Sequence, residues 1–97
     1  MNTKSYSTAE AEDRVRLELP SWGVEDGYLC REFKTANWLA SMAIANQISA
    51  LAEAVNHHPD LLIAWGRVHI KLMTHDAGGI SDKDFSLASA IEGLLHP

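Results

Sequence analysis

The chain has 97 residues, 46% of them hydrophobic and 22% charged, which is typical of one globular domain with a modest core. Its net charge of −5 argues against direct nucleic-acid binding, because that requires a basic face to neutralise phosphates. The lone Cys30 excludes an internal disulfide and fits a reducing cytoplasm. No apolar run could span a membrane, and the first fourteen residues lack the apolar centre of a secretion signal. We therefore expect a single cytoplasmic domain over residues 1–97, with residues 1–6 frayed.

The first predicted elements are a helix and a hairpin. Ser7 and Glu10 have the spacing of a capping box, so a helix is predicted to begin just after Ser7, and Pro20 must end it. The dipeptide Asp26-Gly27 indicates a tight hairpin turn, because both residues tolerate positive φ. Two short antiparallel strands are predicted on either side of this turn, at residues 22–24 and 28–33.

A long helix is the next predicted element. Thr35 can cap it, and the helical pattern continues to about Val55. Its apolar residues recur at intervals of three or four and so share one face, which we expect to be buried: Trp38, Met42, Ala45, Ile48, Ala52 and Val55.

The last third of the chain predicts a second hairpin and a final helix. Two apolar runs, residues 61–65 and 67–73, are separated by Gly66. The second run alternates apolar and polar residues, which indicates a strand with one buried and one wet face. Ser81 and Asp84 form another capping box at the start of a helix. That helix places four apolar residues on one side: Phe85, Ala88, Ile91 and Leu95.

The order of these elements predicts an α+β fold. Helix, two strands, helix, two strands and helix follow one another along the chain. Helices on one face of a mostly antiparallel sheet are the natural way for such elements to bury their apolar sides. We therefore expect a four-stranded, mostly antiparallel sheet with three helices packed on one face.

Three of the five histidines are candidates for a shared site. His57 and His58 fall at the end of the long helix, and His75 falls just past the last strand. Two ends of rigid elements can converge on one pocket, so these imidazoles are candidates for acid–base chemistry. Carboxylates that could orient a ring nitrogen or stabilise an imidazolium are Glu53, which lies one helical turn before His57, together with Asp76 and Asp84.

Two other interpretations fit these histidines. Three histidines could bind zinc, but adjacent histidines seldom reach one metal, and no H-E-x-x-H or C-x-x-C motif is present, so we predict no metal. The histidines could also simply cap the ends of a helix and a strand. Their spacing alone does not decide between this structural role and a common site.

The same residues resemble the signature of the pterin-4a-carbinolamine dehydratase family. They comprise Glu53, His57-His58-Pro59, Trp65, His75 and Asp84, within runs such as NHHPD and THDAGGISDKDF. The resemblance extends over roughly residues 22–95. It implies a four-stranded antiparallel sheet with helices on one side, in homodimers or homotetramers built through sheet edges and helices.

The resemblance also implies an activity. It is a hydro-lyase reaction, the dehydration of 4a-hydroxytetrahydropterin (4a-hydroxytetrahydrobiopterin) to quinonoid dihydropterin. This reaction recycles the tetrahydrobiopterin cofactor of aromatic amino-acid hydroxylases and requires no cofactor or metal of its own.

By this resemblance, individual residues acquire expected roles. His57 and His75 would be the acid candidates, and His58 would hold or deprotonate the pterin. Glu53 and Asp84 would support the histidines. The residues expected to contact the pterin are Trp22, Asn56, Met73, Thr74 and Asp76.

A different class of function is compatible with the same fold. Relatives in this family include transcription coactivators and assembly factors, so a binding protein without catalysis is the main alternative. An accessory role beside an aromatic amino-acid hydroxylase could coexist with activity. The presence of all three histidines with their acidic partners favours catalysis.

Overall fold

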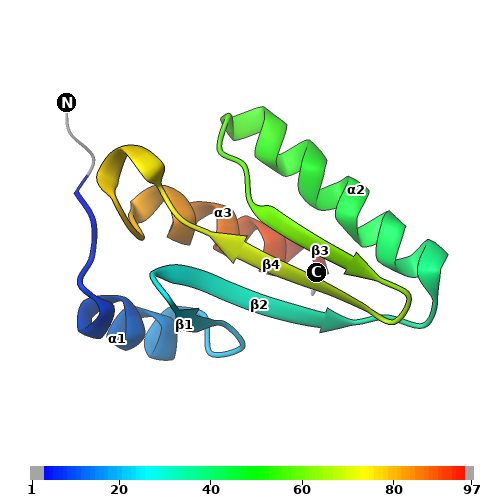
Figure 1. The fold of residues 1–97 in the computed structure, drawn as a ribbon, viewed down its shortest axis with the longest axis horizontal. Helices are drawn as coiled ribbons and strands as arrows, with labels where there is room; N and C mark the ends of the chain where they lie inside the picture. Colours follow the sequence, from blue (N-terminus) through cyan, green and yellow to red (C-terminus); the bar gives the residue numbers. More distant parts are fainter. Residues whose placement is uncertain (1–3, 96–97) are drawn as a thin grey trace.

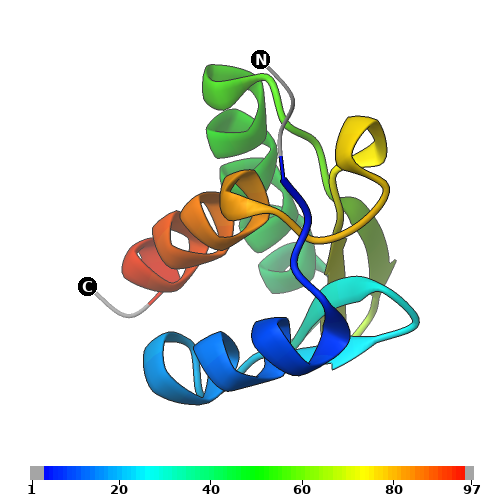
Figure 2. The ribbon, with the colours of Figure 1, turned by 90° about the vertical axis from the view of Figure 1, so that its left-hand side faces the viewer.

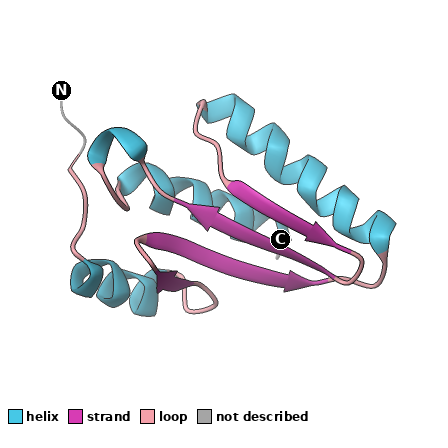
Figure 3. Ribbon diagram, in the orientation of Figure 1, coloured by secondary structure: helices cyan, strands magenta, loops and turns pink. Residues whose placement is uncertain are grey.

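The computed structural model describes residues 4–95 and has the predicted order of elements. The helices and strands are α1 (Thr8–Glu18), β1 (Gly23–Glu25), β2 (Tyr28–Lys34), α2 (Trp38–Val55), β3 (Asp60–Ala64), β4 (Arg67–Leu72) and α3 (Asp82–Leu95), with a short 3₁₀ helix at His75–Ala77 between β4 and α3 (Figure 1). The four strands form one sheet in the order β1-β2-β4-β3, and every neighbouring pair is antiparallel (Figure 3). The helices lie on one side of this sheet (Figure 2). The predicted α+β architecture is therefore confirmed.

The two hairpins follow from local sequence. In the first turn Asp26 has φ of 50° and Gly27 has φ of 82°, so both adopt the left-handed conformation that the Asp-Gly pair predicts. In the second hairpin, the alternating side chains of β4 behave as expected. Val68, Ile70 and Leu72 are fully buried beneath the helices, whereas His69 on the opposite face is only partly covered.

The buried face of α2 is narrower than predicted. Ser41, Ala45, Ile48 and Ala52 are buried, but Trp38 is 48% exposed. The prediction that Trp38 and Val55 lie in the core is wrong, since Val55 is also exposed. The side chains that α2 buries are mostly small, so the apolar residues beside this narrow stripe stay outside the core of the single chain.

Ser5 and Tyr6, which precede α1, contact the segment that leads into α3. Ser5 forms an antiparallel bridge with Ser81, and the Tyr6 amide donates to the Ile80 carbonyl at 2.7 Å. The Tyr6 ring packs edge-on against Phe85 with the ring centroids 5.4 Å apart. Ser5 and Tyr6 thus have partners distant in sequence, while residues 1–3 of the segment expected to fray lie outside the described range.

A polar cluster joins α1 to the start of α3. The Tyr6 hydroxyl donates to Asp82 Oδ1 at 2.5 Å, and the Arg14 guanidinium donates to the same oxygen at 2.6 Å. These two contacts, the hydrogen bond from Tyr6 first, hold the pKa of Asp82 below its usual value of 3.8. A carboxyl with a lowered folded-state pKa adds stability above its unfolded pKa, and this stability is lost as pH falls through the folded value.

We therefore expect Asp82→Asn to reduce the loss of stability at acidic pH. The wild-type melting temperature should fall more steeply than that of the variant as pH drops below about 4, where an unperturbed aspartate titrates. The effect should be small, because the Asp82 side chain is 78% exposed. Thermal unfolding followed by circular dichroism at several pH values measures it. Parallel curves for the two proteins would contradict the assigned role of Asp82.

No helix within residues 4–95 combines the length and the apolar character needed to cross a bilayer.

Candidate functional site

A cleft of about 500 Å³ opens between the end of α2 and the segment that follows β4. Seven of the residues predicted for the site line this cleft: Asn56, His57, His58, Met73, Thr74, His75 and Asp76. The three imidazoles thus come from two chain segments that are distant in sequence and meet in one place. Their convergence favours a shared site over separate capping roles, a choice that the sequence spacing left open.

The end of α2 places two of the histidines. Asn56 has φ of 52° and ψ of 45°, and its amide donates to the Ala52 and Glu53 carbonyls, which closes the helix in the left-handed conformation. The His57 amide then donates to the Ala52 carbonyl at 3.1 Å. Pro59 follows shortly and cannot continue the helix. The chain therefore turns sharply within the Asn-His-His-Pro run, which puts His57 and His58 at the cleft.

His57 is anchored to a buried carboxylate. Its Nε2 lies 2.5 Å from Oδ1 of Asp84, a fully buried residue in the first turn of α3. The other oxygen, Oδ2, accepts from the Thr74 hydroxyl at 2.8 Å and from the Ser81 amide at 2.9 Å. The last of these bonds is one half of the capping geometry predicted from Ser81 and Asp84. Asp84 is thus held rigidly and can fix the orientation of the His57 ring.

His58 is held by Glu53. The distance from His58 Nε2 to Glu53 Oε2 is 2.5 Å, and both side chains are largely exposed. The prediction that Glu53 could face His57 is wrong, because the left-handed Asn56 ends the helical spacing and brings the next residue onto Glu53 instead. In this position Glu53 orients a ring nitrogen of His58, while the exposure of the pair implies a small contribution to stability.

His75 begins the 3₁₀ helix that follows β4, and its side chain is exposed at the cleft. The loop that carries it is closed by a bridge in which the Thr74 amide donates to the Gly79 carbonyl at 2.8 Å. Gly78 has φ of 72°, a conformation that favours glycine. This compact loop fixes the backbone of His75 while leaving its imidazole accessible.

Trp22 neither lines the cleft nor pairs with one of its histidines, unlike the other predicted site residues. It is only 5% exposed and belongs to the hydrophobic core near α1. Its indole Nε1 donates to Glu92 Oε1 at 2.7 Å, and the same oxygen accepts from Arg31 Nε at 2.7 Å. Within this chain Trp22 therefore tethers the C-terminal half of α3 to the sheet, and the expectation that it contacts the substrate is not supported.

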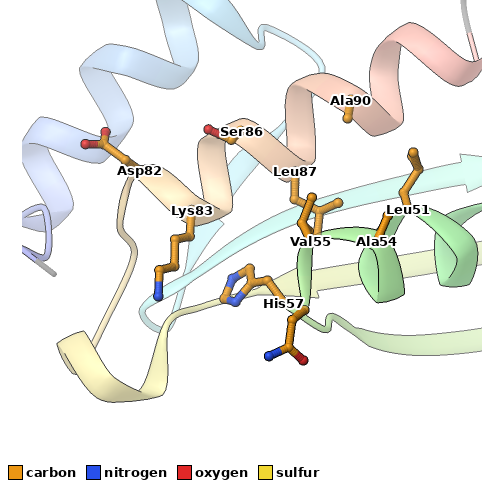
Figure 4. A pocket seen from close by; sticks show the side chains of 10 residues that line it. Leu51, Ala54, Val55, His57, Asp82, Lys83, Ser86, Leu87 and Ala90 are labelled. Atoms are coloured by element: carbon orange, nitrogen blue, oxygen red, sulfur yellow. The ribbon is translucent and has the colours of Figure 1, made fainter.

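Lys83 lines the cleft but was not among the predicted site residues. It adjoins Asp84 in the Ser-Asp-Lys-Asp run, which is the only sequence signal that could have found it. Lys83, Asn56 and His57 also border a neighbouring pocket of about 370 Å³ between α2 and α3, walled by apolar side chains such as Leu51 and Leu87 (Figure 4). This second pocket contains one imidazole, whereas the cleft contains three, so the cleft is the candidate site.

Within residues 4–95, no group of three or more histidine, cysteine, aspartate or glutamate side chains has the arrangement of a metal site. The titratable groups that line the cleft are three imidazoles, two of them paired with carboxylates, together with Asp60, Asp76 and Lys83. Such groups can hold, donate and accept protons around a polar ligand.

These features define an α+β protein with a histidine cleft, and comparison with known proteins specifies its family. The sequence profile described as pterin 4 alpha carbinolamine dehydratase matches residues 4–94. The chain therefore belongs to the pterin-4-alpha-carbinolamine dehydratase family.

Individual relatives agree with this assignment. A protein from Chloroflexus aurantiacus is 43% identical over 88 residues, which cover 90% of this chain and 95% of the relative. One from Aquifex aeolicus is 41% identical over 88 residues, covering 88% of this chain and 89% of the relative. Both are provisionally named pterin-4-alpha-carbinolamine dehydratases.

A solved structure shares the fold. The transcriptional coactivator/pterin dehydratase from Brucella melitensis superposes with a TM-score of 0.84 at 24% identity, covering 94% of this chain and 98% of the other. A pterin dehydratase-like protein identified as a RuBisCO assembly factor in the alpha-carboxysome superposes with a TM-score of 0.62 at 20% identity, covering 77% and 87%.

Proposed function

We propose that this protein dehydrates 4a-hydroxytetrahydropterin to quinonoid dihydropterin by histidine acid–base catalysis. The observation that carries the proposal is the meeting of His57, His58 and His75 at one cleft, with His57 bound to the buried Asp84. Family membership supports the same class of reaction.

The reaction needs proton transfers that imidazoles can perform. The substrate carries a hydroxyl on a ring carbon bonded to nitrogen, and hydroxide is a poor leaving group. An acid protonates the oxygen as the carbon–oxygen bond breaks, so water departs with the bonding electron pair. The nitrogen lone pair forms the new carbon–nitrogen double bond, and a base takes the proton that the nitrogen then releases. Imidazole has an unperturbed pKa of about 6.5 and can serve in either direction near neutral pH.

The geometry suggests how the residues divide this work. His57 and His75 are the acid candidates, approaching the cleft from its two sides. His58, oriented by Glu53, would hold the pterin ring or accept its proton. Asn56, Met73, Thr74 and Asp76 contribute the remaining walls against which the flat ring would lie.

A direct assay tests this proposal. The carbinolamine is generated in place, and the appearance of the quinonoid product is followed by ultraviolet absorbance. The purified protein should accelerate product formation well beyond the rate in buffer. A rate equal to that in buffer would overturn the dehydratase proposal.

The alternative is a binding or assembly role without catalysis. One protein that shares the fold is a pterin dehydratase-like protein identified as a RuBisCO assembly factor, so the fold alone does not distinguish the two functions. The site supports catalysis, because a scaffold has no need of three imidazoles around a cleft, two of them paired with carboxylates. We therefore favour catalysis. The reaction would recycle the tetrahydropterin cofactor of an aromatic amino-acid hydroxylase.

We further propose that the protein is a homodimer or homotetramer. Strand β3 lies at an edge of the sheet, with a row of backbone groups available for pairing. Large apolar side chains near this edge and on α2 are exposed: Trp38, Leu39, Leu62 and Trp65. A second copy that covers the edge and this face would bury both features.

Light scattering at micromolar concentration should accordingly give a mass of two or four chains. Leu39 is 77% exposed, so Leu39→Glu should leave the monomer folded while lowering the mass, because burying a charge at an apolar interface is unfavourable. Leu17→Glu on α1, at a residue that is 85% exposed, is a matched control that should leave the mass unchanged. A strictly monomeric wild-type protein would contradict the proposed assembly.

A further inference from the structure

An apolar pocket of about 370 Å³ lies beside the cleft, between α2 and α3. Leu51 and Val55 of α2 face Leu87 of α3 across it, with His57 at one end (Figure 4). Three residues line both the pocket and the cleft: Asn56, His57 and Lys83. A molecule that contacts these residues from within the cleft therefore lies next to the pocket.

The pocket is open because small side chains line it where the two helices approach each other. Ala54 comes from α2, and Ser86 and Ala90 come from α3. All three residues are exposed, so they border the opening of the pocket to solvent. A leucine at any of these positions would fill part of the pocket and leave the core intact, because the positions lie outside the core.

The pocket and the cleft suit different parts of one ligand. Three imidazoles and three charged side chains line the cleft, whereas most of the residues that line the pocket alone are apolar. The carboxylate at the pocket, Asp82, already accepts from Tyr6 and Arg14. A pterin ring has nitrogen and oxygen atoms along its edges and suits the polar cleft. An alkyl or aryl group on that ring suits the pocket, because each CH₂ removed from water strengthens binding about fourfold.

We propose that the pocket between α2 and α3 binds a short apolar substituent of a pterin whose ring lies in the cleft. The identity of the ring rests on the proposed dehydratase function. The pocket adds the class of substrate, namely pterins with an alkyl or aryl substituent in preference to those with a polyhydroxylated side chain. Hydroxyl groups placed against the apolar wall would lose their hydrogen bonds to water without gaining equivalent partners.

The position of the pocket favours a small ligand over a second copy of the chain. Trp38 and Leu39, which we propose for assembly, begin α2, whereas the pocket lies at the other end of that helix. Among the described residues that line the pocket, Val55 is the one large apolar side chain that is exposed. The pocket is thus separate from the proposed interface and adjoins the histidines instead. Its volume is also within the usual range of about 300–1,000 Å³ for small-molecule sites.

Calorimetry with dihydropterins that the protein does not dehydrate tests the pocket without relying on catalysis. The wild type should bind 6-propyl-7,8-dihydropterin about 15-fold more tightly than the 6-methyl compound, because two more CH₂ groups are buried. Ala90→Leu should bring the two Kd values close together by filling the pocket. Leucine is a good helix former, so the helix should be retained, and Ala54→Leu provides the same test from the opposite wall if Ala90→Leu does not fold.

Ala9→Leu is the matched control, since Ala9 is an exposed alanine of α1 that does not line the pocket. This variant should keep the 15-fold ratio. Equal Kd values in the wild type, or an unchanged ratio in both filling variants, would overturn the proposal. A filling variant that lowers the mass in light scattering but keeps the ratio would assign the pocket to assembly and would also overturn it.

Turnover gives a second readout. The 4a-carbinolamine with a 6-propyl group should have a higher kcat/KM than the one with a 6-(1,2-dihydroxypropyl) group, which has the same carbon skeleton. Ala90→Leu should reduce this difference. If no carbinolamine is turned over while the Kd preference persists, the dehydratase is contradicted and the pocket is supported. If both carbinolamines are turned over with equal kcat/KM and the Kd values are also equal, the pocket proposal fails and the dehydratase stands.

Discussion

His75→Ala should lower kcat for carbinolamine dehydration by a factor on the order of 10²–10⁴, the usual contribution of a positioned acid or base. The fold should be unaffected, because the His75 side chain is exposed at the cleft, and substitutions at such positions usually change stability by less than about 0.5 kcal/mol. The ultraviolet assay of quinonoid product gives kcat, and thermal unfolding gives the stability. A variant with normal stability and wild-type kcat would remove His75 from the mechanism.

His57 requires a different substitution to give an equally clear result. His57→Ala should also reduce kcat, but it leaves the buried Asp84 without its imidazole partner and so costs stability as well. His57→Gln is the cleaner variant, because its amide can still donate to Asp84 yet cannot act as an acid or base. His69→Ala is the matched control, since His69 lies on β4 and is not among the residues that line the cleft. We expect the control to retain full activity.

Local signals in the sequence predicted most of the fold. The Asp26-Gly27 turn, the capping pairs and the alternation along β4 each involve residues only a few positions apart, so their physical causes are visible in the sequence. The width of the buried face of a helix cannot be predicted from such local signals. Periodicity showed that Trp38 and Val55 share a side of α2 with buried residues, but how far the sheet extends beneath that side depends on tertiary packing. These two residues are consequently exposed.

The sequence predicted most residues of the candidate site but fewer of the contacts between them. The histidines and Asp84 could be identified from their spacing and their resemblance to a family. The partner of Glu53 could not be identified in this way. The left-handed conformation of Asn56 moves His58 into the place that regular helix geometry gives to His57. Trp22 matched a family position but is buried in the core of the chain. The bond between Thr74 and Ser81 joins a loop to a helix start, which local sequence patterns do not reveal.

Asp84→Asn should also lower kcat strongly. It removes the negative charge beside His57 and replaces one hydrogen-bond acceptor by a donor. Oδ2 of Asp84 accepts from two buried donors, so the amide oxygen of asparagine should occupy that position. The amide nitrogen then faces His57 Nε2 and donates to it, which forces the ring proton onto Nδ1. The variant loses both the carboxylate that stabilises an imidazolium and the acceptor that favours a ring proton on Nε2. We expect kcat to fall on the order of 10²–10⁴-fold, with NMR showing a proton on Nδ1.

The stability of two further variants separates this effect from simple damage to the fold. Asp84→Ala leaves the Ser81 amide and the Thr74 hydroxyl without their acceptor, at a cost of about 1–3 kcal/mol for each buried donor, so it should be clearly less stable than Asp84→Asn in urea denaturation. Asp82→Asn changes an exposed carboxylate in the same helical turn and should keep its activity near pH 7, because Asp82 is not among the residues that line the cleft. Retention of wild-type kcat by Asp84→Asn would mean that His57 works without a carboxylate partner. If Asp84→Asn and Asp82→Asn lose kcat equally, any change at the start of α3 lowers activity. That result would contradict a specific role for Asp84.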